Sequence, residues 1–468
     1  MSESNNPFKQ FMNIRRDELP QILLMFSYFF LVITSFWILK PLKKSIFVQF
    51  YRDTGFHFLG MSMDAAQAEL IAKVANMFVA LAAATLFAYF SQWFRRQQLT
   101  YVFSGIILVG YLYFIWTIHE PRDHTVWSFY FFGDLYSTLM VATFFAFLND
   151  SVDPEKAKRV YGLIGLGGVA GGALGSSTVA AKISDLSMQE WLWICSAVSV
   201  IIVGIAAVAG KLFAREFPVP PSPSPKEKPQ SHENPATAGA RLVFQSRYLM
   251  SIVAIVGLYE MVSTIMDFQF TSTVAHYLQG PAIGVHFSKV FAFTNWVALI
   301  VQFFLTSFVM TRYGVGAALL FLPAAALLGS TGFLLAPLLL VGSFLNTADN
   351  GFSYSINQSA KEVLYVPTTS DEKYKAKAFI DMFIQRFAKA LAVGLSLLIT
   401  FSFKGFESIR WLSLLTVLIL VAWIAIARYA GREFKRLTTR YQESQSVSGA
   451  SAEKQWPPSQ GRPLTARH

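Results

Sequence analysis

The chain has 468 residues, of which 54% are hydrophobic and only 14% are charged. Soluble proteins carry about a quarter charged residues, so this composition excludes an ordinary soluble globular fold. The formal net charge of +11 does not by itself indicate a nucleic-acid binder, because cytoplasmic loops of membrane proteins are rich in Lys and Arg.

Apolar runs long enough to cross a bilayer recur along the chain, and they predict an all-α polytopic membrane protein. Twelve transmembrane helices are expected near residues 20–40, 68–91, 99–118, 125–149, 159–182, 189–212, 247–278, 286–311, 315–336, 338–360, 376–402 and 408–429. A stretch rich in Pro, Ser and charge divides them into six and six, and this composition indicates a flexible linker. The expected parts are an N-terminal segment (1–19), an N-terminal half (20–213), the linker (214–246), a C-terminal half (247–430) and a disordered tail (431–468).

Lys and Arg concentrate in the loops on one predicted side of the membrane, including Arg95, Arg159, Arg312 and Lys373. The opposite side has few cations. The positive-inside rule therefore places both termini and the linker in the cytoplasm.

The two predicted halves share a weak internal repeat. Glu155 at the start of the fifth span and Glu372 at the start of the eleventh are 217 positions apart, and Arg95 and Arg312 have the same offset. Two six-helix halves related by duplication are typical of a major-facilitator-like transporter. The alternative is coincidence among basic cytoplasmic loops, which is less favoured because spacing and span order agree.

Three lysines, Lys40, Lys43 and Lys44, lie toward the predicted outer end of the first span, against the charge rule. Snorkelling of the amines to lipid headgroups is expected for one or two of them. We expect that the three do not share one direction and that Lys43 faces inward, where an ammonium group attracts an anion. Lys73 in the second span and Asp134 in the fourth are further intramembrane charges.

Residues 354–389 lie between two strongly apolar stretches, yet they are rich in charge. Asp381, Gln385 and Lys389 recur every four residues and therefore share one face of a predicted helix. Charge within a membrane span costs several kcal/mol unless it faces a partner or a water-filled path. The segment is therefore interpreted as the wall of a polar cavity in a carrier of a polar substrate.

Acidic residues in the C-terminal half allow two interpretations. Glu260 and Asp267 are seven positions apart in the seventh span, and Asp349 lies in the tenth. Each is either a structural partner of a lysine on another helix or a group with a direct role in transport. Ion pairs that break and re-form between conformations serve both purposes.

Glycines recur every three to four positions between residues 162 and 175. Gly165, Gly167 and Ala170 match a dinucleotide-binding pattern, but no strand precedes them, so that interpretation is rejected. The spacing indicates close packing against a neighbouring helix.

Other chemistry has little support in the sequence. Cys195 is the only cysteine, which excludes an intramolecular disulfide and a cysteine-based zinc cluster. No Walker A motif and no histidine pair with metal-ligand spacing occur in the chain. We expect no enzymatic activity, no metal and no cofactor.

Several motifs resemble those of the ATP/ADP translocase (nucleotide transporter) family of plastids and intracellular bacteria. KEVLYVP at 361–367 and EKYKAKAFID at 372–381 resemble the family's KEMAYIP and KxKGKAAID stretches. ILKPLKK at 38–44 is similar to the family's ILRxxKD segment, and DLYS at 134–137 to its ELWGS segment. The resemblance extends over roughly residues 20 to 430 and implies a twelve-span, major-facilitator-like fold.

The family's important charges are carried over where the motifs match. Its lysines in the first and last of these segments fall on Lys43 and Lys377, and its ELWGS glutamate falls on Asp134. A further family glutamate has no clean match, although Glu260 and Asp267 lie nearby.

The leading hypothesis is a secondary transporter that moves an anionic, phosphorylated metabolite across a bacterial inner membrane. Its most specific form is exchange of ATP for ADP. The expected partners are this small substrate and membrane lipids, without nucleic acid, and we expect a monomer. The expected substrate-binding residues are Lys43, Lys73, Asp134, Lys377, Asp381, Gln385, Arg386 and Lys389. The expected charge-compensating or proton-coupling residues are Glu260, Asp267 and Asp349.

Two alternatives stay open at this point. One is a proton-coupled major-facilitator transporter of another amphipathic anion or a lipid phosphate, with Asp134 or Glu260 as the proton carrier. The other is a membrane scaffold or sensor that keeps the fold without transporting anything, so that neutralising Lys43 and Lys377 changes no flux.

Overall fold

A computed structural model describes residues 19–58, 60–151, 154–216, 235–368, 376–403 and 405–453. Within these ranges the protein is almost entirely helical, as expected for a chain whose backbone polar groups must be satisfied within lipid. The N-terminal half consists of α2 (Leu19–Thr54), α3 (Ala65–Trp93), α4 (Arg96–Thr117), α5 (Asp123–Ser151), α6 (Pro154–Lys182) and α7 (Met188–Glu216). A short antiparallel hairpin of β1 (Phe56–Phe58) and β2 (Met61–Met63) joins α2 to α3, with Phe56 opposite Met63.

The C-terminal half begins with a short helix and continues with longer ones that contain π-helical segments. Its first elements are α8 (Pro235–Gln245), α9 (Arg247–Tyr277), α10 (Pro281–Ile300), η1 (Val301–Thr306), α11 (Ser307–Arg312) and α12 (Val315–Leu335). The remaining elements are α13 (Leu339–Phe352), η2 (Ser353–Asn357), α14 (Gln358–Val363), α15 (Lys377–Phe379), η4 (Ile380–Ile384), α16 (Gln385–Ser402), η5 (Phe406–Ser408) and α17 (Ile409–Glu453).

Ten helical segments in the described part of the chain are long and apolar enough to cross a membrane. They correspond to ten of the twelve expected spans and make this a multi-pass membrane protein. The other two expected spans, 338–360 and 376–402, are helical, but η2 and η4 interrupt them. These two segments carry several of the polar residues of the cavity described below, including Asp349 and Asp381, and their membrane crossing stays a prediction.

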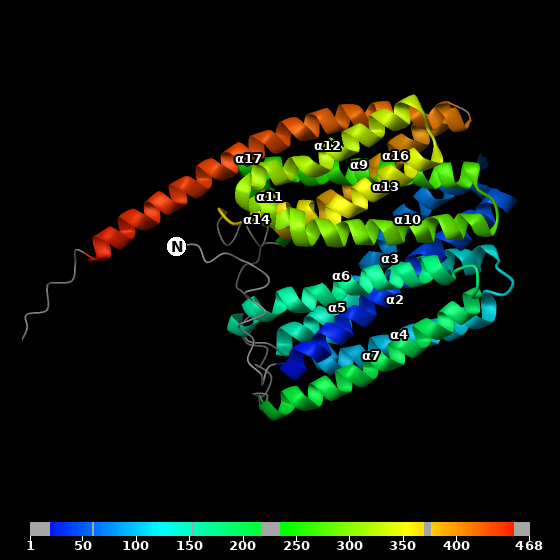
Figure 1. The fold of residues 1–468 in the computed structure, drawn as a ribbon, viewed down its shortest axis with the longest axis horizontal. Helices are drawn as coiled ribbons and strands as arrows, with labels where there is room; N and C mark the ends of the chain where they lie inside the picture. Colours follow the sequence, from blue (N-terminus) through cyan, green and yellow to red (C-terminus); the bar gives the residue numbers. More distant parts are fainter. Residues whose placement is uncertain are drawn as a thin grey trace, which may run out of the picture.

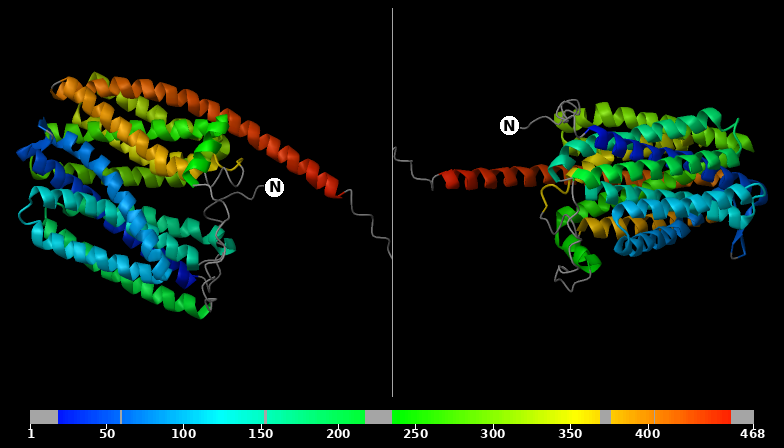
Figure 2. Two further views of the ribbon diagram at one scale, coloured as in Figure 1. Left: turned by 180° about the vertical axis from the view of Figure 1, so that it is seen from behind. Right: turned by 90° about the horizontal axis from the view of Figure 1, so that it is seen from below.

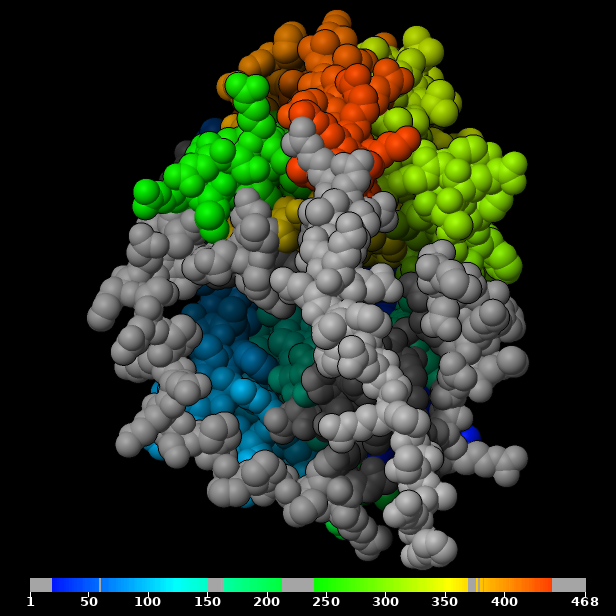
Figure 3. Space-filling model, turned by 90° about the vertical axis from the view of Figure 1, so that its left-hand side faces the viewer, coloured from blue at the N-terminus to red at the C-terminus, as the bar shows by residue number. Residues whose placement is uncertain are grey.

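The helices form two bundles that lie side by side, with α2–α7 in one and α9–α17 in the other (Figure 1). The space-filling view from the end of the molecule shows blue to teal residues on one side and green to orange residues on the other (Figure 3). Each bundle has its own apolar core, which includes Tyr28 and Phe144 in the first and Ile265 and Trp423 in the second. A third apolar cluster joins the bundles, because it contains Phe47 of α2 and Phe287 of α10.

The contact between α2 and α6 depends on glycine. A Cβ atom at Gly167 would lie 2.6 Å from the carbonyl oxygen of Phe26, and one at Gly175 would lie 2.5 Å from that of Thr34. A Cβ at Gly171, midway between them, would clash with the carbonyl oxygen of Phe30. Three glycines spaced by four residues therefore allow the two backbones to approach closely, which confirms the packing interpretation of this repeat.

Replacing Gly171 with valine is expected to destabilise the protein by about 2–3 kcal/mol, because the added atoms force the α2 and α6 backbones apart. Thermal unfolding of the purified protein measures the effect. Gly204→Val in α7 is the matched control, since no atom lies within 4 Å of a Cβ at that helical glycine. Equal losses at the two positions would show a helix-propensity effect and contradict the close packing.

Two expectations for the connecting segments are wrong in part. Residues 235–245 of the expected flexible linker form α8, and residues 431–453 of the expected disordered tail continue α17. Figure 2 shows α17 projecting beyond the bundle at the end where α2 begins. Residues 432–445 contain no Gly or Pro and many long straight side chains, which favour helix, and the next proline is Pro457. Residues 217–234 and 454–468 lie outside the described ranges.

Candidate functional site

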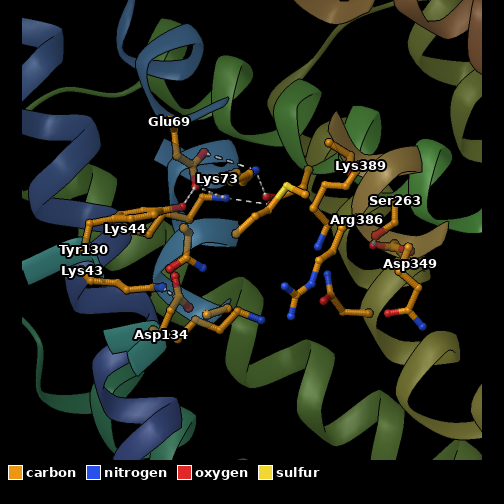
Figure 4. Close-up of a pocket in the computed structure, with 18 of the residues that line it drawn as sticks. Lys43, Lys44, Glu69, Lys73, Tyr130, Asp134, Ser263, Asp349, Arg386 and Lys389 are labelled. Carbon is orange, nitrogen blue, oxygen red and sulfur yellow. Dashed lines mark hydrogen bonds and ion pairs between the residues drawn. The ribbon is translucent and has the colours of Figure 1, made fainter. Parts of the chain in front are cut away.

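A cavity of about 440 Å³ lies between the two bundles, and polar side chains dominate its wall. Figure 4 shows side chains of α2, α3 and α5 facing side chains of the C-terminal half across it. We call it the central cavity. Its lining residues are Lys40, Lys43, Lys44, Glu69, Lys73, Asn76, Met77, Ala80, Tyr130, Asp134, Ser263, Thr264, Asp267, Phe291, Asn346, Asp349, Asn350, Asp381, Gln385, Arg386 and Lys389.

Lys40, Lys43 and Lys44 all line the central cavity, so the expectation that one or two of them snorkel to headgroups is wrong. The expectation that they point in different directions is also wrong. Residues at positions i, i+3 and i+4 of a helix lie on one face, and α2 continues through Pro41 without interruption. The turn therefore presents three ammonium groups to the same space.

Lys43 forms an ion pair with Asp134 of α5. Its ammonium also lies 4.5 Å from the ring centroid of Tyr130, one turn earlier on α5. Gly133 makes room for this arrangement, because a Cβ there would lie 2.6 Å from Cδ of Lys43. The Lys43 side chain is only 7% exposed, so a carboxylate partner is needed to stabilise its charge.

Four charged residues, Lys44, Glu69, Lys73 and Asp267, form an ion cluster that joins the two bundles. Asp267 of α9 accepts from Lys44 of α2 at 2.7 Å and pairs with Lys73 of α3 through its other oxygen. Glu69 lies 3.2 Å from Lys44 and 3.7 Å from Lys73. The cluster therefore links α2 and α3 to α9 through charges that are largely removed from solvent (Figure 4).

Glu69 also belongs to this cluster, although sequence reasoning missed it. Its two oxygens accept hydrogen bonds from the hydroxyl groups of Tyr130, at 3.2 Å, and Thr271, at 2.9 Å. A capping box between Asp64 and Gln67 begins α3 and sets the direction of the turn that follows. The spacing of four residues between Glu69 and Lys73 was the signal that could have identified it.

The C-terminal half contributes a looser set of polar groups. Ser263 donates a hydrogen bond to Asp349 at 2.6 Å, and Gln385 donates one to Asp381 at 3.1 Å. Lys389 lies 3.7 Å from Glu260, which is not among the cavity-lining residues. Asp381 lies in η4, and π-helical segments of this kind occur frequently at functional sites.

Two cations of the cavity lack an acidic partner. Within the part of the chain that the structure describes, no carboxylate lies within 4.0 Å of the charged nitrogens of Lys40 or Arg386. The Lys40 ammonium instead lies 4.3 Å from the ring centroid of Trp37. In the described ranges, no group of three or more His, Cys, Asp and Glu side chains is arranged to hold a metal ion.

Nine of the eleven residues singled out in the sequence line the central cavity: Lys43, Lys73, Asp134, Asp267, Asp349, Asp381, Gln385, Arg386 and Lys389. Glu260 contacts one of them, Lys389. Lys377 does not line the cavity, because it pairs with Glu362 at 2.5 Å on the side of the molecule that carries α14 and α15.

Contacts between the bundles close the end that carries the β1–β2 hairpin. Arg52 donates to the carbonyl oxygen of Ala275 at 2.5 Å, and Gln67 donates to Thr400 at 3.1 Å. A second hollow of about 360 Å³ lies at this end. Gln67 lines that hollow while Glu69 lines the central cavity, so the ion cluster lies close to the boundary between the two spaces.

Comparison with known proteins finds one matching family. A family model described as TLC ATP/ADP transporter matches residues 109–337 and 322–434. ADP,ATP carrier protein 1 of Arabidopsis thaliana chloroplasts is 24% identical over 364 residues, which cover 70% of this chain and 58% of the relative. ADP,ATP carrier protein 1 of Chlamydia muridarum is 22% identical over 396 residues, which cover 76% of this chain and 73% of the relative. The chain thus spans less than two thirds of the chloroplast relative's length.

Solved structures share the fold at low sequence identity. The nucleoside transporter NupG is 14% identical with a TM-score of 0.58, over 88% of this chain and 99% of that protein. A bacterial homologue of the human lysosomal transporter Spinster is 13% identical with a TM-score of 0.55, over 91% of this chain and 99% of that protein. The all-α, major-facilitator-like fold expected from the sequence is therefore confirmed.

Proposed function

Because the chain belongs to the TLC ATP/ADP transporter family, we propose that it exchanges nucleotides, ATP for ADP, across a bacterial inner membrane by alternating access. The substrate occupies the central cavity between the two bundles, and both termini lie in the cytoplasm. Substrate gradients supply the driving force. The names of the chloroplast and chlamydial relatives and the chemistry of the cavity support this proposal.

The observation that carries the proposal is an excess of cations in a cavity of suitable size. The wall contains six cations and five acids, and the cations Lys40 and Arg386 have no acidic partner among the described residues. Arg386 offers a planar fork of donors that matches two phosphate oxygens. Pockets for molecules of nucleotide size measure roughly 300–1,000 Å³, a range that includes this one.

Exchange rather than one-way transport follows from the ion pairs. Asp134, Asp267 and Glu69 together neutralise Lys43, Lys44 and Lys73 while no substrate is present. A phosphate chain that binds these lysines replaces the carboxylates and releases the link between α9 and the N-terminal bundle. An empty cavity keeps the link, so reorientation depends on bound substrate in both directions.

The proton-coupled alternative has less support. Asp134 is paired with Lys43, and Glu260 lies 3.7 Å from Lys389, so both expected proton carriers already have a cationic partner for which a phosphate can compete. The scaffold alternative does not explain why cations without acidic partners line an internal cavity.

Binding of ATP and ADP is expected to raise the apparent melting temperature of the purified protein, because a ligand of the native state stabilises it by mass action. Arg386→Ala is expected to weaken ATP binding roughly 10- to 100-fold, the usual loss for a hydrogen bond to a charged group. Arg386→Lys is expected to weaken ATP binding less, since the positive charge remains and only the bidentate hydrogen bonding is lost.

Arg312→Ala is the matched control, because Arg312 is exposed at the end of α11 and does not line the cavity. Its ATP affinity should equal that of the wild type. Stabilisation by inorganic phosphate or another anion, with no response to any nucleotide, would contradict nucleotide exchange.

A further inference from the structure

Lys40 has the most unusual surroundings of the cavity lysines. Its ammonium lies 4.3 Å from the ring centroid of Trp37, 5.3 Å from that of Phe291 and 5.7 Å from that of Tyr354. No carboxylate of the described residues lies within ion-pair distance of it. Aromatic faces attract a cation through their quadrupole, so the rings stabilise this charge while no acid competes for it.

The rings come from both bundles and form one cluster. Trp37 belongs to α2, whereas Phe291 belongs to α10 and Tyr354 to η2. Trp37 packs edge-to-face against both, with centroid separations of 6.1 Å to Phe291 and 6.4 Å to Tyr354. The cluster borders the central cavity through Lys40 and Phe291.

Tyr354 differs from the other two rings in its exposure. It is 55% exposed, whereas Trp37 is 6% and Phe291 is 2% exposed. It lies in a π-helical segment, where the wider turn changes the direction of the side chains that follow. Tyr354 is not itself among the residues that line the central cavity, but its ring lies 5.7 Å from the ammonium of Lys40, which does line it. Its exposed face is therefore available to stack on a planar ligand held by Lys40.

We propose that this aromatic cluster is the subsite for the nucleobase and that Lys40 leaves the face of Trp37 when it pairs with substrate phosphate. This inference rests on the proposed function, because it assigns the nucleobase of the proposed substrate to the aromatic cluster. The base then occupies the space that the ammonium gave up and stacks on the exposed face of Tyr354, beside the ring of Trp37.

The movement of Lys40 away from the rings is favourable only when the ligand has both a phosphate and a nucleobase. A charge-assisted hydrogen bond to phosphate is stronger than a cation–π contact, so phosphate draws the lysine from the rings. The freed faces gain a stacking partner in the base. A nucleoside without phosphate must displace the ammonium without offering it a partner, and a polyphosphate without a base leaves the ring faces empty.

The test is a binding titration of ATP, inorganic tripolyphosphate and adenosine against the purified full-length protein. Tyr354→Ala is expected to weaken ATP binding roughly 5- to 150-fold, the range for loss of one base–aromatic stack, and to leave tripolyphosphate binding unchanged. Lys40→Ala is expected to weaken both ATP and tripolyphosphate and to strengthen adenosine binding, because the face of Trp37 is vacant.

Tyr313→Ala is the matched control, since Tyr313 is 62% exposed but packs against Phe308 and not against the aromatic cluster around Lys40. It should bind all three ligands as the wild type does. Equal losses of ATP and tripolyphosphate affinity in Tyr354→Ala, or weaker adenosine binding in Lys40→Ala, would overturn the base subsite. If the wild type binds no ATP at all, it is the proposed function that fails instead.

Discussion

Replacing Asp267 with alanine is expected to uncouple exchange, so that uptake no longer requires internal nucleotide, and to lower the free energy of unfolding by about 3 kcal/mol or more. The substitution leaves Lys44 and Lys73 with Glu69 as their only acidic partner within 4.0 Å among the described residues. The side chain of Lys44 is 6% exposed, so water cannot compensate for the lost carboxylate. Transport into proteoliposomes and thermal unfolding of the same preparation measure the two effects.

Asp185→Ala is the matched control for this substitution. Asp185 pairs with Lys182 at 2.9 Å, but both side chains are about 60% exposed, and exposed pairs contribute little to stability. The double variant Asp267→Ala/Lys73→Ala should recover part of the lost stability, because it removes one unpaired charge. An Asp267→Ala protein that unfolds and transports like Asp185→Ala would show that the ion cluster does not link the bundles.

The second large effect is expected at the pair of Lys43 and Asp134. Each single alanine variant should lower exchange at least 100-fold, because it removes one charge and leaves the other poorly compensated. The double variant Lys43→Ala/Asp134→Ala should fold with stability closer to the wild type and remain inactive, since no ammonium is left there to attract phosphate.

This double variant separates the two interpretations that the sequence left open for the cavity acids. If the pair were only structural, removing both charges would restore exchange as well as stability. Recovery of exchange in the double variant would therefore assign Lys43 and Asp134 to the scaffold of the bundle. Uptake rates normalised to folded protein in the vesicles provide the measurement.

The fold could be predicted largely from the sequence because its determinants are local. Long apolar runs predict helices in a membrane, and closely spaced glycines predict that α6 packs tightly against a neighbouring helix, which the structure identifies as α2. Of the segments that sequence reasoning misjudged, 431–453 is polar, and polarity alone does not separate a solvated helix from a disordered chain. Residues 235–245 directly follow a stretch rich in Pro, Ser and charge and were assigned together with it.

Residues of the site could be predicted only where their side chains lie on one face of a single helix. Asp381, Gln385 and Lys389 share a face of one continuous segment, and their place in the cavity wall follows from spacing. The link from Asp267 to Lys44 and Lys73 joins three helices, so no pattern within one helix indicates it. Lys377 was expected at the substrate site because its motif resembles that of a family lysine. Its position beside Glu362 instead depends on how α14 and α15 pack, which the motif does not reveal.

Nucleotide counterflow in proteoliposomes tests the central claim most directly. Vesicles preloaded with ADP, and matched empty vesicles, receive labelled ATP outside in the presence and absence of a pH gradient. The proposed exchange predicts rapid ATP uptake only into the preloaded vesicles, with no requirement for the pH gradient. Equal uptake into empty vesicles, or uptake that depends on the pH gradient and not on internal ADP, would contradict it.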